Sequence, residues 1–360
     1  MRVLHVIGAR PGSGAEHQLR LLLRRLPQDG EVVTLGPPAP VLRAIGAPLR
    51  ELPTAGDRDF GAIGRLRRVI RDGRFDVVHT HLFRACVQGR AAARLAGMPR
   101  LVATEYHADE GSRTAVGVRA LYLAGERYGG VTIAASAPVA DRLRRWGVPG
   151  DRVVLIPKAL DPAEFAYDPR LRAAARQRLR IPPGTPVIGA VGRLEPRRRF
   201  DSLIRAVAEV PGAILLLVGD GPAQVALQRL AAIEGVSDRV LFAGRVEHAR
   251  EMLCAMDVFA SPGRETSGLA VLEALAAGLP ALYAACPPLE EMAAARTPVR
   301  DARRLTPHDP ESLPRALRTE VLCHDERHGA RLPARTLPER YRANRMAADV
   351  GELYERVAAS

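Results

Sequence analysis

Short apolar runs alternate with amphipathic segments through the first half of the chain. The apolar runs have the length and β-branched content of buried strands, and the segments between them show helical spacing. This alternation predicts a parallel sheet with helices on its faces. The predicted strands are 3–8, 31–36, 76–81, 100–107, 131–136 and 152–157, and the predicted helices are 12–26, 61–73, 88–97, 113–127 and 138–146.

The pattern restarts at residue 186 and predicts a second parallel sheet. We therefore expect an α/β protein of two doubly wound domains, with the ligand in a crevice between them at the carboxyl ends of the strands. The segment 293–336, rich in Arg and Pro, shows no clear periodicity. The predicted strands are 186–194, 213–222, 239–244, 258–262 and 281–285, and the predicted helices are 202–210, 223–234, 248–256 and 338–360.

Composition narrows the choice of partners. The 360 residues suffice for two domains, and a hydrophobic content of 47% with only 4% aromatic residues predicts aliphatic cores. The net charge of +13 points toward an anionic partner, but Lys158 is the only lysine among 53 basic residues, so part of the excess reflects a general preference for Arg. Because stacking aromatics and known nucleic-acid modules are lacking, we expect no nucleic-acid partner.

Cysteines and apolar runs indicate the compartment. The four cysteines are scattered without a CxxC pair, which argues against a disulfide framework and against a zinc site. The first apolar run is too short for a signal peptide, and no run reaches transmembrane length. We expect a cytoplasmic protein. Arg-rich 61–73 and the helix near 113–127 suggest peripheral contact with the inner face of the cytoplasmic membrane, and a solvated face is the alternative.

The segment 261–280 carries the most specific chemistry. A strand runs into a polar loop with Glu265, Gly268 opens a helix, and Glu273 lies in that helix, eight residues after Glu265. Unpaired N–H groups and the helix dipole at this N-terminus can hold a phosphate, and the two carboxylates can take hydroxyl groups of an attached sugar. The segment favours a binding site for a nucleotide sugar. The alternative is that both glutamates are solvated.

Arginines and glycine turns follow other predicted strands. Arg193 ends a strand in VGRL, and a run of three arginines follows at 197–199. Guanidinium groups fork onto phosphate oxygens, which suits a diphosphate leaving group, although the first and third of that run fit a solvated turn better. The glycine turns at 12–16 and 219–222 either let the backbone approach a ligand closely or form simple tight turns.

Histidines gather near strand ends in the first half, at His79, His81 and His107. They can serve acceptor binding or proton transfer, but a structural role is the commoner one for each taken singly. No motif such as HExxH accompanies them, and we expect no metal.

The order of these motifs resembles that of retaining glycosyltransferases of the GT-B fold, in the large family 4 group. The resemblance covers nearly the whole chain and includes the glycine loop 12–16, DVVHTH, VGRLEP, VGDGP, LFAG and the segment with the two glutamates. It implies two Rossmann-like domains facing across a deep cleft. These are an N-terminal acceptor-side domain, 1–158, with the closing helix 338–360 packed back on it, and a C-terminal nucleotide-sugar-binding domain, 159–337.

The resemblance also implies roles for individual positions. It implies no cofactor or metal beyond the nucleoside diphosphate sugar, because arginines and a helix end supply the positive charge. The residues expected at the reaction centre are Arg193 and Arg198 on the donor diphosphate, Glu265 at the reacting face of the sugar, and His107 near the reacting carbon, a slot for which Tyr106 competes. The residues expected to bind the donor are Gly14, Gly192 and Gly219 in the glycine turns, Arg245 beside the base, Ser267, Gly268 and Leu269 through backbone N–H groups, and Glu273 on the ribose.

The expected function is transfer of a hexosyl unit, with retention of configuration, from a UDP- or GDP-linked sugar to a hydroxyl group of a lipid-linked glycan or small-molecule acceptor. Thr266-Ser267 replaces the Gly-Phe usual in the family, and Pro287-Pro288 replaces a usual Gly-Gly. These departures keep two alternatives open, a nucleotide-sugar epimerase of the same fold and a donor-binding protein with little catalysis. The incomplete first glycine motif counts against a third, a nicotinamide-dependent dehydrogenase.

Overall fold

The computed structural model describes most of the chain and divides it into two compact units. Unit 1 comprises Met1–Leu160 and Glu339–Ser360, and unit 2 comprises Asp161–Pro338. The described residues are 1–8, 14–54, 59–106, 116–127, 130–263, 267–294, 301–306, 309, 311–326, 330–332 and 338–359.

Leu160 belongs to unit 1 because the segment that begins at Glu339 pairs with it. The N–H of Leu160 donates to the Tyr341 carbonyl at 3.0 Å, and the Leu160 carbonyl accepts from the N–H of Ala343 at 3.0 Å. This two-sided pairing keeps Leu160 in unit 1, two residues beyond the boundary expected after 158.

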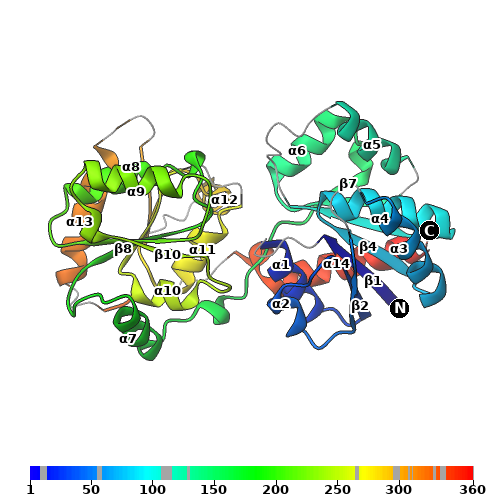
Figure 1. The fold of residues 1–360 in the computed structure, drawn as a ribbon, viewed down its shortest axis with the longest axis horizontal. Helices are drawn as coiled ribbons and strands as arrows, with labels where there is room; N and C mark the ends of the chain where they lie inside the picture. The colour runs from blue at the N-terminus through cyan, green and yellow to red at the C-terminus, as the bar shows by residue number, and fades with distance from the viewer. Residues whose placement is uncertain are drawn as a thin grey trace. The chain divides into compact units, whose positions relative to one another are not determined.

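Unit 1 is built on a parallel sheet of seven strands, in the order β3-β2-β1-β4-β5-β6-β7 (Figure 1). The strands are β1 (Arg2–Gly8), β2 (Asp29–Leu35), β3 (Leu49–Leu52), β4 (Val77–His81), β5 (Leu101–Glu105), β6 (Val131–Ala134) and β7 (Val153–Leu155). The helices are α1 (Gly14–Leu23), α2 (Pro40–Arg43), α3 (Gly61–Gly73), α4 (Phe83–Ala96), α5 (Val116–Glu126), α6 (Ala137–Trp146) and α14 (Ala343–Ala359), with short 3-10 turns at Gly150–Arg152 and Glu339–Tyr341.

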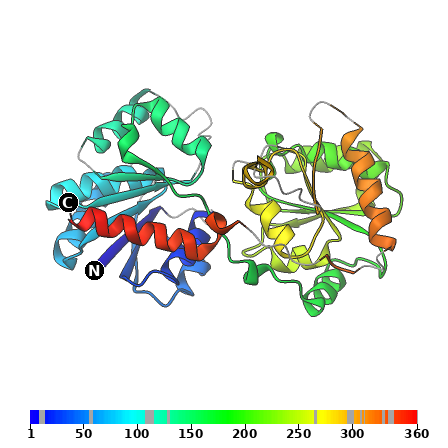
Figure 2. The ribbon, with the colours of Figure 1, turned by 180° about the vertical axis from the view of Figure 1, so that it is seen from behind.

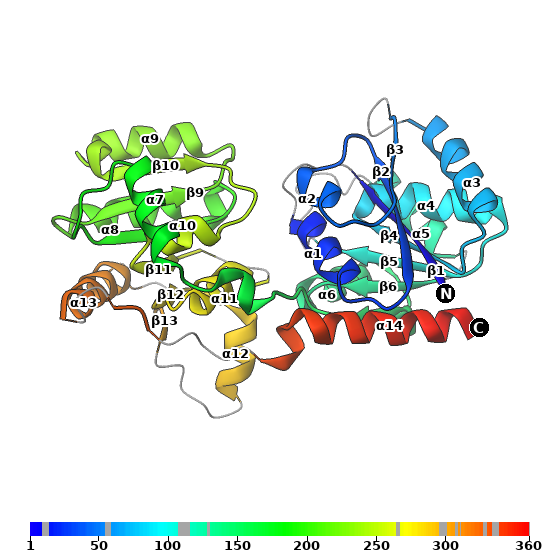
Figure 3. The ribbon, with the colours of Figure 1, turned by 90° about the horizontal axis from the view of Figure 1, so that it is seen from below.

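Alternate side chains of the strands feed two apolar layers of unit 1. On β1, Val3 packs in a cluster with residues of α1 and α14, whereas Leu4 and Val6 pack in a cluster with residues of α3 and α4. The closing helix α14, red in Figures 2 and 3, contributes Met346 and Val350 to the first layer. A chain segment that ends the sequence therefore completes the core of the unit that begins it.

Unit 2 has a parallel sheet of six strands, in the order β10-β9-β8-β11-β12-β13. The strands are β8 (Val187–Val191), β9 (Ile214–Val218), β10 (Val240–Gly244), β11 (Val258–Ser261), β12 (Ala281–Tyr283) and β13 (Ala302–Arg304). The helices are α7 (Pro169–Arg178), α8 (Phe200–Ala208), α9 (Gln224–Ile233), α10 (Arg250–Ala255), α11 (Leu269–Ala276), α12 (Pro287–Ala294) and α13 (Ser312–Glu326), with 3-10 turns at Pro162–Phe165, Pro196–Arg198 and Ser237–Arg239.

The helices of unit 2 cover both faces of its sheet, as the doubly wound pattern requires. Residues of α8, α9 and α13 share one apolar cluster with β8, β9 and β11. Figure 1 shows α8 and α9 on one side of this sheet and α7 and α10 on the other. None of the helices in the described ranges has the length and apolar character needed to cross a bilayer.

A buried carboxylate joins α7 to the amino ends of β8 and β11. Asp257, only 4% exposed, pairs with Arg172 at 2.6 Å and with Arg176 at 2.5 Å, and it accepts the N–H of Val187 at 2.8 Å. Arg331 lies beside this group and donates to the carbonyl of Cys254 at 2.7 Å. Charged contacts, rather than an apolar stripe, therefore hold α7, in which Ala175 is the buried residue.

The structure adds elements that the pattern along the sequence did not predict. These are α2, β3, α7, α12, β13 and α13, the last within the segment left without assignment. The predicted helix 88–97 was wrong at its start, since α4 begins at Phe83, directly after Leu82 with its positive φ of 73°.

We expect Asp257→Asn to destabilise unit 2. The change leaves two arginines partly buried without their counter-charge, which typically costs about 3 kcal/mol or more. Urea unfolding followed by circular dichroism measures this cost. The control is Glu209→Gln, which removes an exposed partner of Arg318 and should change stability by less than about 0.5 kcal/mol. A loss for Asp257→Asn no larger than that of the control would contradict the role given to this carboxylate.

Candidate active site

The predicted donor residues of unit 2 come from loops at one edge of its sheet. Strands β9, β8 and β11 are neighbours and run parallel, so the loops that follow them leave from the same edge. The loop after β8 carries Gly192 and Arg193, the loop after β9 carries Gly219, and the loop after β11 leads to α11. The carboxyl edge of this sheet is therefore the candidate active site.

Glycines allow these loops to approach one another closely. Gly219 has φ 136°, and a Cβ on it would overlap the carbonyl oxygen of Gly192. The Gly192 N–H donates to the Val218 carbonyl at 2.9 Å, which continues the pairing of β8 with β9 into the loops. In the same way, a Cβ on Gly263, after β11, would overlap the backbone of Arg197 and Arg198. Backbone contacts, rather than side chains, thus join the three loops.

Arg198 lies where the loops after β8 and β11 meet. Its guanidinium lies against Gly192, with its Cζ and one terminal nitrogen 3.3 Å from where a Cβ of that glycine would be. The side chain is half-buried, and burial, followed by repulsion from Arg197, lowers the pKa of Arg198 to about 10. Arg198 therefore stays protonated at neutral pH while it is partly desolvated, a state that an anion would stabilise.

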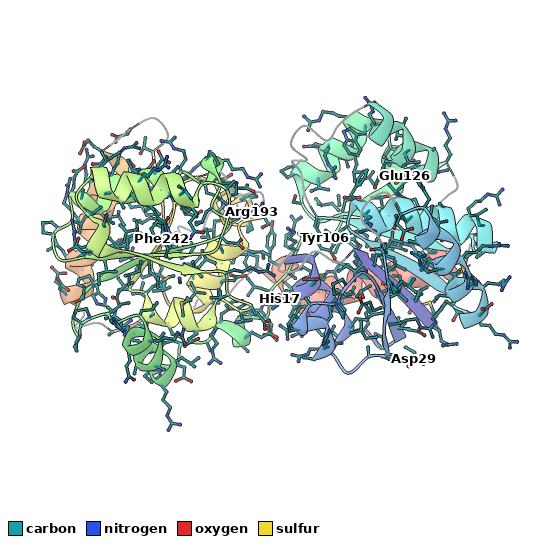
Figure 4. All side chains as sticks on the ribbon, viewed as in Figure 1. His17, Asp29, Tyr106, Glu126, Arg193 and Phe242 are labelled. Atoms are coloured by element: carbon teal, nitrogen blue, oxygen red, sulfur yellow. The ribbon has the colours of Figure 1, made fainter. Side chains whose placement is uncertain are left out.

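Arg193 is exposed and has a partner that the motif analysis missed. Its Nε lies 2.6 Å from Oε1 of Glu195, and Nε of Arg197 lies 2.7 Å from Oε2 of the same carboxylate. Figure 4 shows Arg193 and Phe242 on unit 2. The acidic residue in the motif VGRLEP is the signal in the sequence for this pairing.

The helix α11 begins next to these loops. Its N-cap, Gly268, is buried and has φ 67°, a conformation that favours glycine, and a Cβ there would approach Sγ of Cys286 to 2.6 Å and Cδ of Pro288 to 2.9 Å. The N–H groups of the first turn, from Leu269 on, have no acceptor within the helix. Cys286 and Pro288 thus form a wall behind Gly268, which the sequence analysis did not foresee.

Glu273, one turn into α11, is a titratable group held in a poorly solvated place. The residue is half-buried, and desolvation alone raises the pKa of its carboxyl group from 4.5 to about 8. At neutral pH a large share of this carboxyl is therefore protonated and can both donate and accept hydrogen bonds. Hydroxyl groups of a sugar or ribose offer matching partners.

The loop after β10 borders the same edge. The Gly244 carbonyl accepts the N–H of Gly219 at 2.8 Å, so this loop is joined to that after β9. Arg245 is exposed and Phe242 is half-buried. The predicted base-side turn is therefore continuous with the glycine turns.

Some predicted residues lie elsewhere or outside the described part of the chain. Glu265 and His107 are outside the described residues, and their roles stay predictions. Gly14 begins α1 in unit 1, is exposed, and has open space among the described atoms where a Cβ would be. Ser267 is half-buried directly before Gly268. The structure therefore brings Gly192, Arg198 and Gly219 into contact, with Arg193 in the same loop as Gly192; the other predicted residues lie directly after β10 (Arg245) and at or in α11 (Ser267, Gly268, Leu269 and Glu273).

Unit 1 contains a buried polar layer between its sheet and α14. His5 on β1 pairs in register with His79 on β4, so both imidazoles point to the same face, as does His81 two residues on. His79 contacts the hydroxyl of Tyr354 at 2.5 Å, and His81 contacts the hydroxyl of Tyr106 at 3.1 Å. The histidines of β4 were predicted from the sequence, but His5 was not, because only the strand register brings it to them.

These imidazoles are neutral. Burial lowers the pKa of His5 to about 3 and those of His79 and His81 well below the usual value. The three lie close enough together to hold a metal ion. However, hydrogen-bonding contacts already engage both ring nitrogens of His79 and of His81, and Nδ1 of His5, which lies 3.2 Å from Nε2 of His81. The layer is best described as a hydrogen-bonded network that ends at Tyr106.

Two family models match the chain, one in each unit. Residues 12–164 match the model described as Glycosyltransferase Family 4, and residues 185–320 match the model described as Glycosyl transferases group 1. The second match spans the loops of the candidate site.

Curated relatives match over parts of their length. The lipopolysaccharide core biosynthesis glycosyltransferase LpsE of Rhizobium meliloti (strain 1021) is 41% identical over 119 residues, 33% of this chain and 35% of that protein. The D-inositol 3-phosphate glycosyltransferase of Nocardia farcinica (strain IFM 10152) is 32% identical over 239 residues, 59% of this chain and 52% of that protein. The alignments therefore span about a third and about half of these two relatives.

A solved structure shows the same fold over the whole chain. Anabaena Alr3699/HepE, crystallised with UDP and glucose, is 19% identical and superposes with a TM-score of 0.75, covering 100% of this chain and 97% of that chain. At this identity the likeness concerns the fold.

Protonation of Glu273 should make stability depend on pH. The folded state holds this proton up to about pH 8, whereas the unfolded chain releases it near pH 4.5, so stability falls as pH rises between these values. The slope from one such group is at most about 1.4 kcal/mol per pH unit. Urea unfolding from pH 5 to pH 8, roughly this window, should show that Glu273→Gln flattens this decline, whereas Glu209→Gln retains it. An unchanged slope in Glu273→Gln would mean that the carboxyl group is solvated.

Proposed function

Because the chain belongs to the family 4 glycosyltransferases of the GT-B fold, we propose that it transfers a hexosyl unit from a nucleoside diphosphate sugar to an acceptor hydroxyl group. The donor nucleotide is proposed to be UDP or GDP, and the transfer to retain configuration at the sugar. The observation that carries the proposal is the carboxyl edge of unit 2, where glycine contacts bring Arg198 against Gly192.

The proposed mechanism assigns charge stabilisation to unit 2. Arg193, Arg198 and the first-turn N–H groups of α11 bind the diphosphate and stabilise the negative charge that grows on it as the sugar leaves. The acceptor hydroxyl attacks the anomeric carbon from the face that the diphosphate leaves, and its proton passes to a departing phosphate oxygen. Glu273 holds the ribose hydroxyls, and Glu265 contacts the donor sugar. With these cations in place, no metal is proposed.

The acceptor is proposed to approach from unit 1. There the network of His81 and Tyr106 fixes the end of β5, next to the position of His107 in the sequence. The names of the two relatives mention lipopolysaccharide core biosynthesis and D-inositol 3-phosphate. A lipid-linked glycan or a small polyhydroxylated molecule is the acceptor class proposed here.

A turnover experiment tests this function. Thermal-shift measurements with UDP- and GDP-linked sugars first identify the donor, because a ligand that binds the native state raises the melting temperature. We expect Glu265→Gln to lower transfer from that donor by about a hundredfold or more, as for loss of a group that stabilises the transition state, with an unchanged melting temperature. Glu209→Gln is the control and should retain full transfer.

Three results would count against the proposal. Full transfer in Glu265→Gln would overturn the assignment of this residue. Conversion of the donor to an epimer when no acceptor is present would identify a nucleotide-sugar epimerase instead. Donor binding without product from any acceptor would indicate a binding protein.

The Arg-rich face of α3 is proposed to contact an anionic membrane peripherally. Arg67, Arg68 and Arg71 are exposed there, Phe60 before the helix is 70% exposed, and Leu95 of α4, whose carbonyl accepts from Nε of Arg67, is 58% exposed. Basic side chains around exposed apolar groups suit a surface of anionic lipid headgroups.

Vesicle binding tests this contact. Co-sedimentation with vesicles containing phosphatidylglycerol should show binding that weakens as salt rises, and Arg68→Glu should weaken it by about fivefold or more, because each cation near the surface contributes about 1 kcal/mol and the new carboxylate is repelled. Arg229→Glu, an exposed change on α9 of unit 2, is the charge-matched control. Absence of binding at low salt would leave α3 as a solvated face.

A further inference from the structure

The carboxylate of Glu195 is shared between two guanidinium groups of the candidate site. Oε1 lies 2.6 Å from Nε of Arg193, and Oε2 lies 2.7 Å from Nε of Arg197. The Glu195 side chain is 22% exposed, and those of the two arginines are 62% and 44% exposed. One partly buried carboxylate thus lies between two more exposed cations.

The electrostatic influence of Glu195 also reaches the partly desolvated cation of the site. Attraction by Glu195 raises the pKa of Arg198, against the larger lowering effects of burial and of Arg197. Three arginines, at 193, 197 and 198, therefore interact with this single carboxylate. In the protein without a donor, Glu195 offsets part of the repulsion among like charges.

A bound diphosphate would compete with this carboxylate. Glu195 lies three residues after Gly192, in the loop that leaves the end of β8, and its contact with Arg193 uses the Nε of the guanidinium. The positive charge of this guanidinium is partly neutralised while it is paired with Glu195, so it attracts a phosphate less strongly. The Glu195 carboxylate would also repel a phosphate bound to the same arginines, because the two anions then share one set of cations.

We propose that Glu195 is an internal counter-anion that sets the donor affinity of this site, a role that rests on the function proposed above. It engages Arg193 and Arg197 when no diphosphate is bound and yields Arg193 to the diphosphate on binding. This exchange lowers the affinity of the site for any anion that cannot replace all of the contacts that Glu195 makes with the arginines. The residue thus acts on binding through the arginines and is a positioning residue rather than a catalytic one.

Direct binding measurements test the proposal. We expect Glu195→Gln to bind inorganic pyrophosphate, UDP and GDP about threefold to fivefold more tightly than the wild type, measured by isothermal titration calorimetry at low salt. The gain should shrink as salt rises, because the removed repulsion is screened. Glu209→Gln is the matched control, since it removes the same charge and an ion pair with Arg318 at the other end of α8, and it should bind as the wild type does.

The role of Arg193 is tested by a double-mutant cycle. In the Arg193→Ala background, Glu195→Gln should gain clearly less affinity than in the wild type, because the contested cation is gone. Equal gains in both backgrounds would show that Glu195 acts by repulsion alone and would overturn the exchange. Unchanged or weaker binding in Glu195→Gln would overturn the proposal, the latter by showing that the carboxylate holds the arginines in a productive position.

Different experimental results would overturn the role of Glu195 and the proposed function. Turnover of a nucleotide sugar by the wild type, together with unchanged pyrophosphate affinity in Glu195→Gln, removes only the counter-anion role. Tighter pyrophosphate binding in Glu195→Gln without turnover of any sugar nucleotide keeps that role and removes the transferase. Absence of pyrophosphate binding by both proteins overturns the anion site on which the inference depends.

Discussion

The loops after β8, β9 and β11 approach one another more closely than side chains would allow, and the candidate site depends on this approach. Glycine at 219 and 263 removes the Cβ atoms that would otherwise separate the backbones, and glycine at 192 leaves room for the guanidinium of Arg198. Hydrogen bonds then continue from strand to loop, as from Gly219 to Gly244. The loops leave from the carboxyl edge of the parallel sheet, and the close contacts at the glycines hold these loops, and the polar groups on them, together.

Charge is distributed unevenly over these loops. Arg198 is protonated but partly desolvated, Glu273 is largely neutral because it is desolvated, and Glu195 supplies a negative charge that pairs with Arg193 and Arg197. A ligand with a diphosphate and hydroxyl groups would complement Arg198 and Glu273, and its diphosphate would compete with Glu195 for the arginines. The buried histidines of unit 1 are neutral instead. They lie beside α14 and form hydrogen-bonding contacts with one another and with nearby hydroxyl groups.

Both parallel sheets could be predicted from the sequence, because most of their strands are apolar runs between amphipathic helices. The pattern along the sequence missed α7 because charged contacts from Arg172 and Arg176 to Asp257 hold that helix, and no apolar stripe marks it. Motif order pointed to Arg193 and Glu273, yet spacing along the chain carries no information on which loops touch. Cys286 and His5 therefore emerged only from contacts between elements, whereas Glu195 stands in the motif VGRLEP and its pairing with two arginines emerged from the conformation of one loop.

Hydrogen–deuterium exchange with and without UDP or GDP tests the central claim most directly, because it reports on every loop at once. If the carboxyl edge of unit 2 is the donor seat, one of these nucleotides should slow exchange in peptides covering Gly192–Phe200, Gly219–Ala223 and the start of α11, while α13 keeps its rate. Protection confined to other segments, or none at saturating concentrations of both nucleotides, would contradict the account.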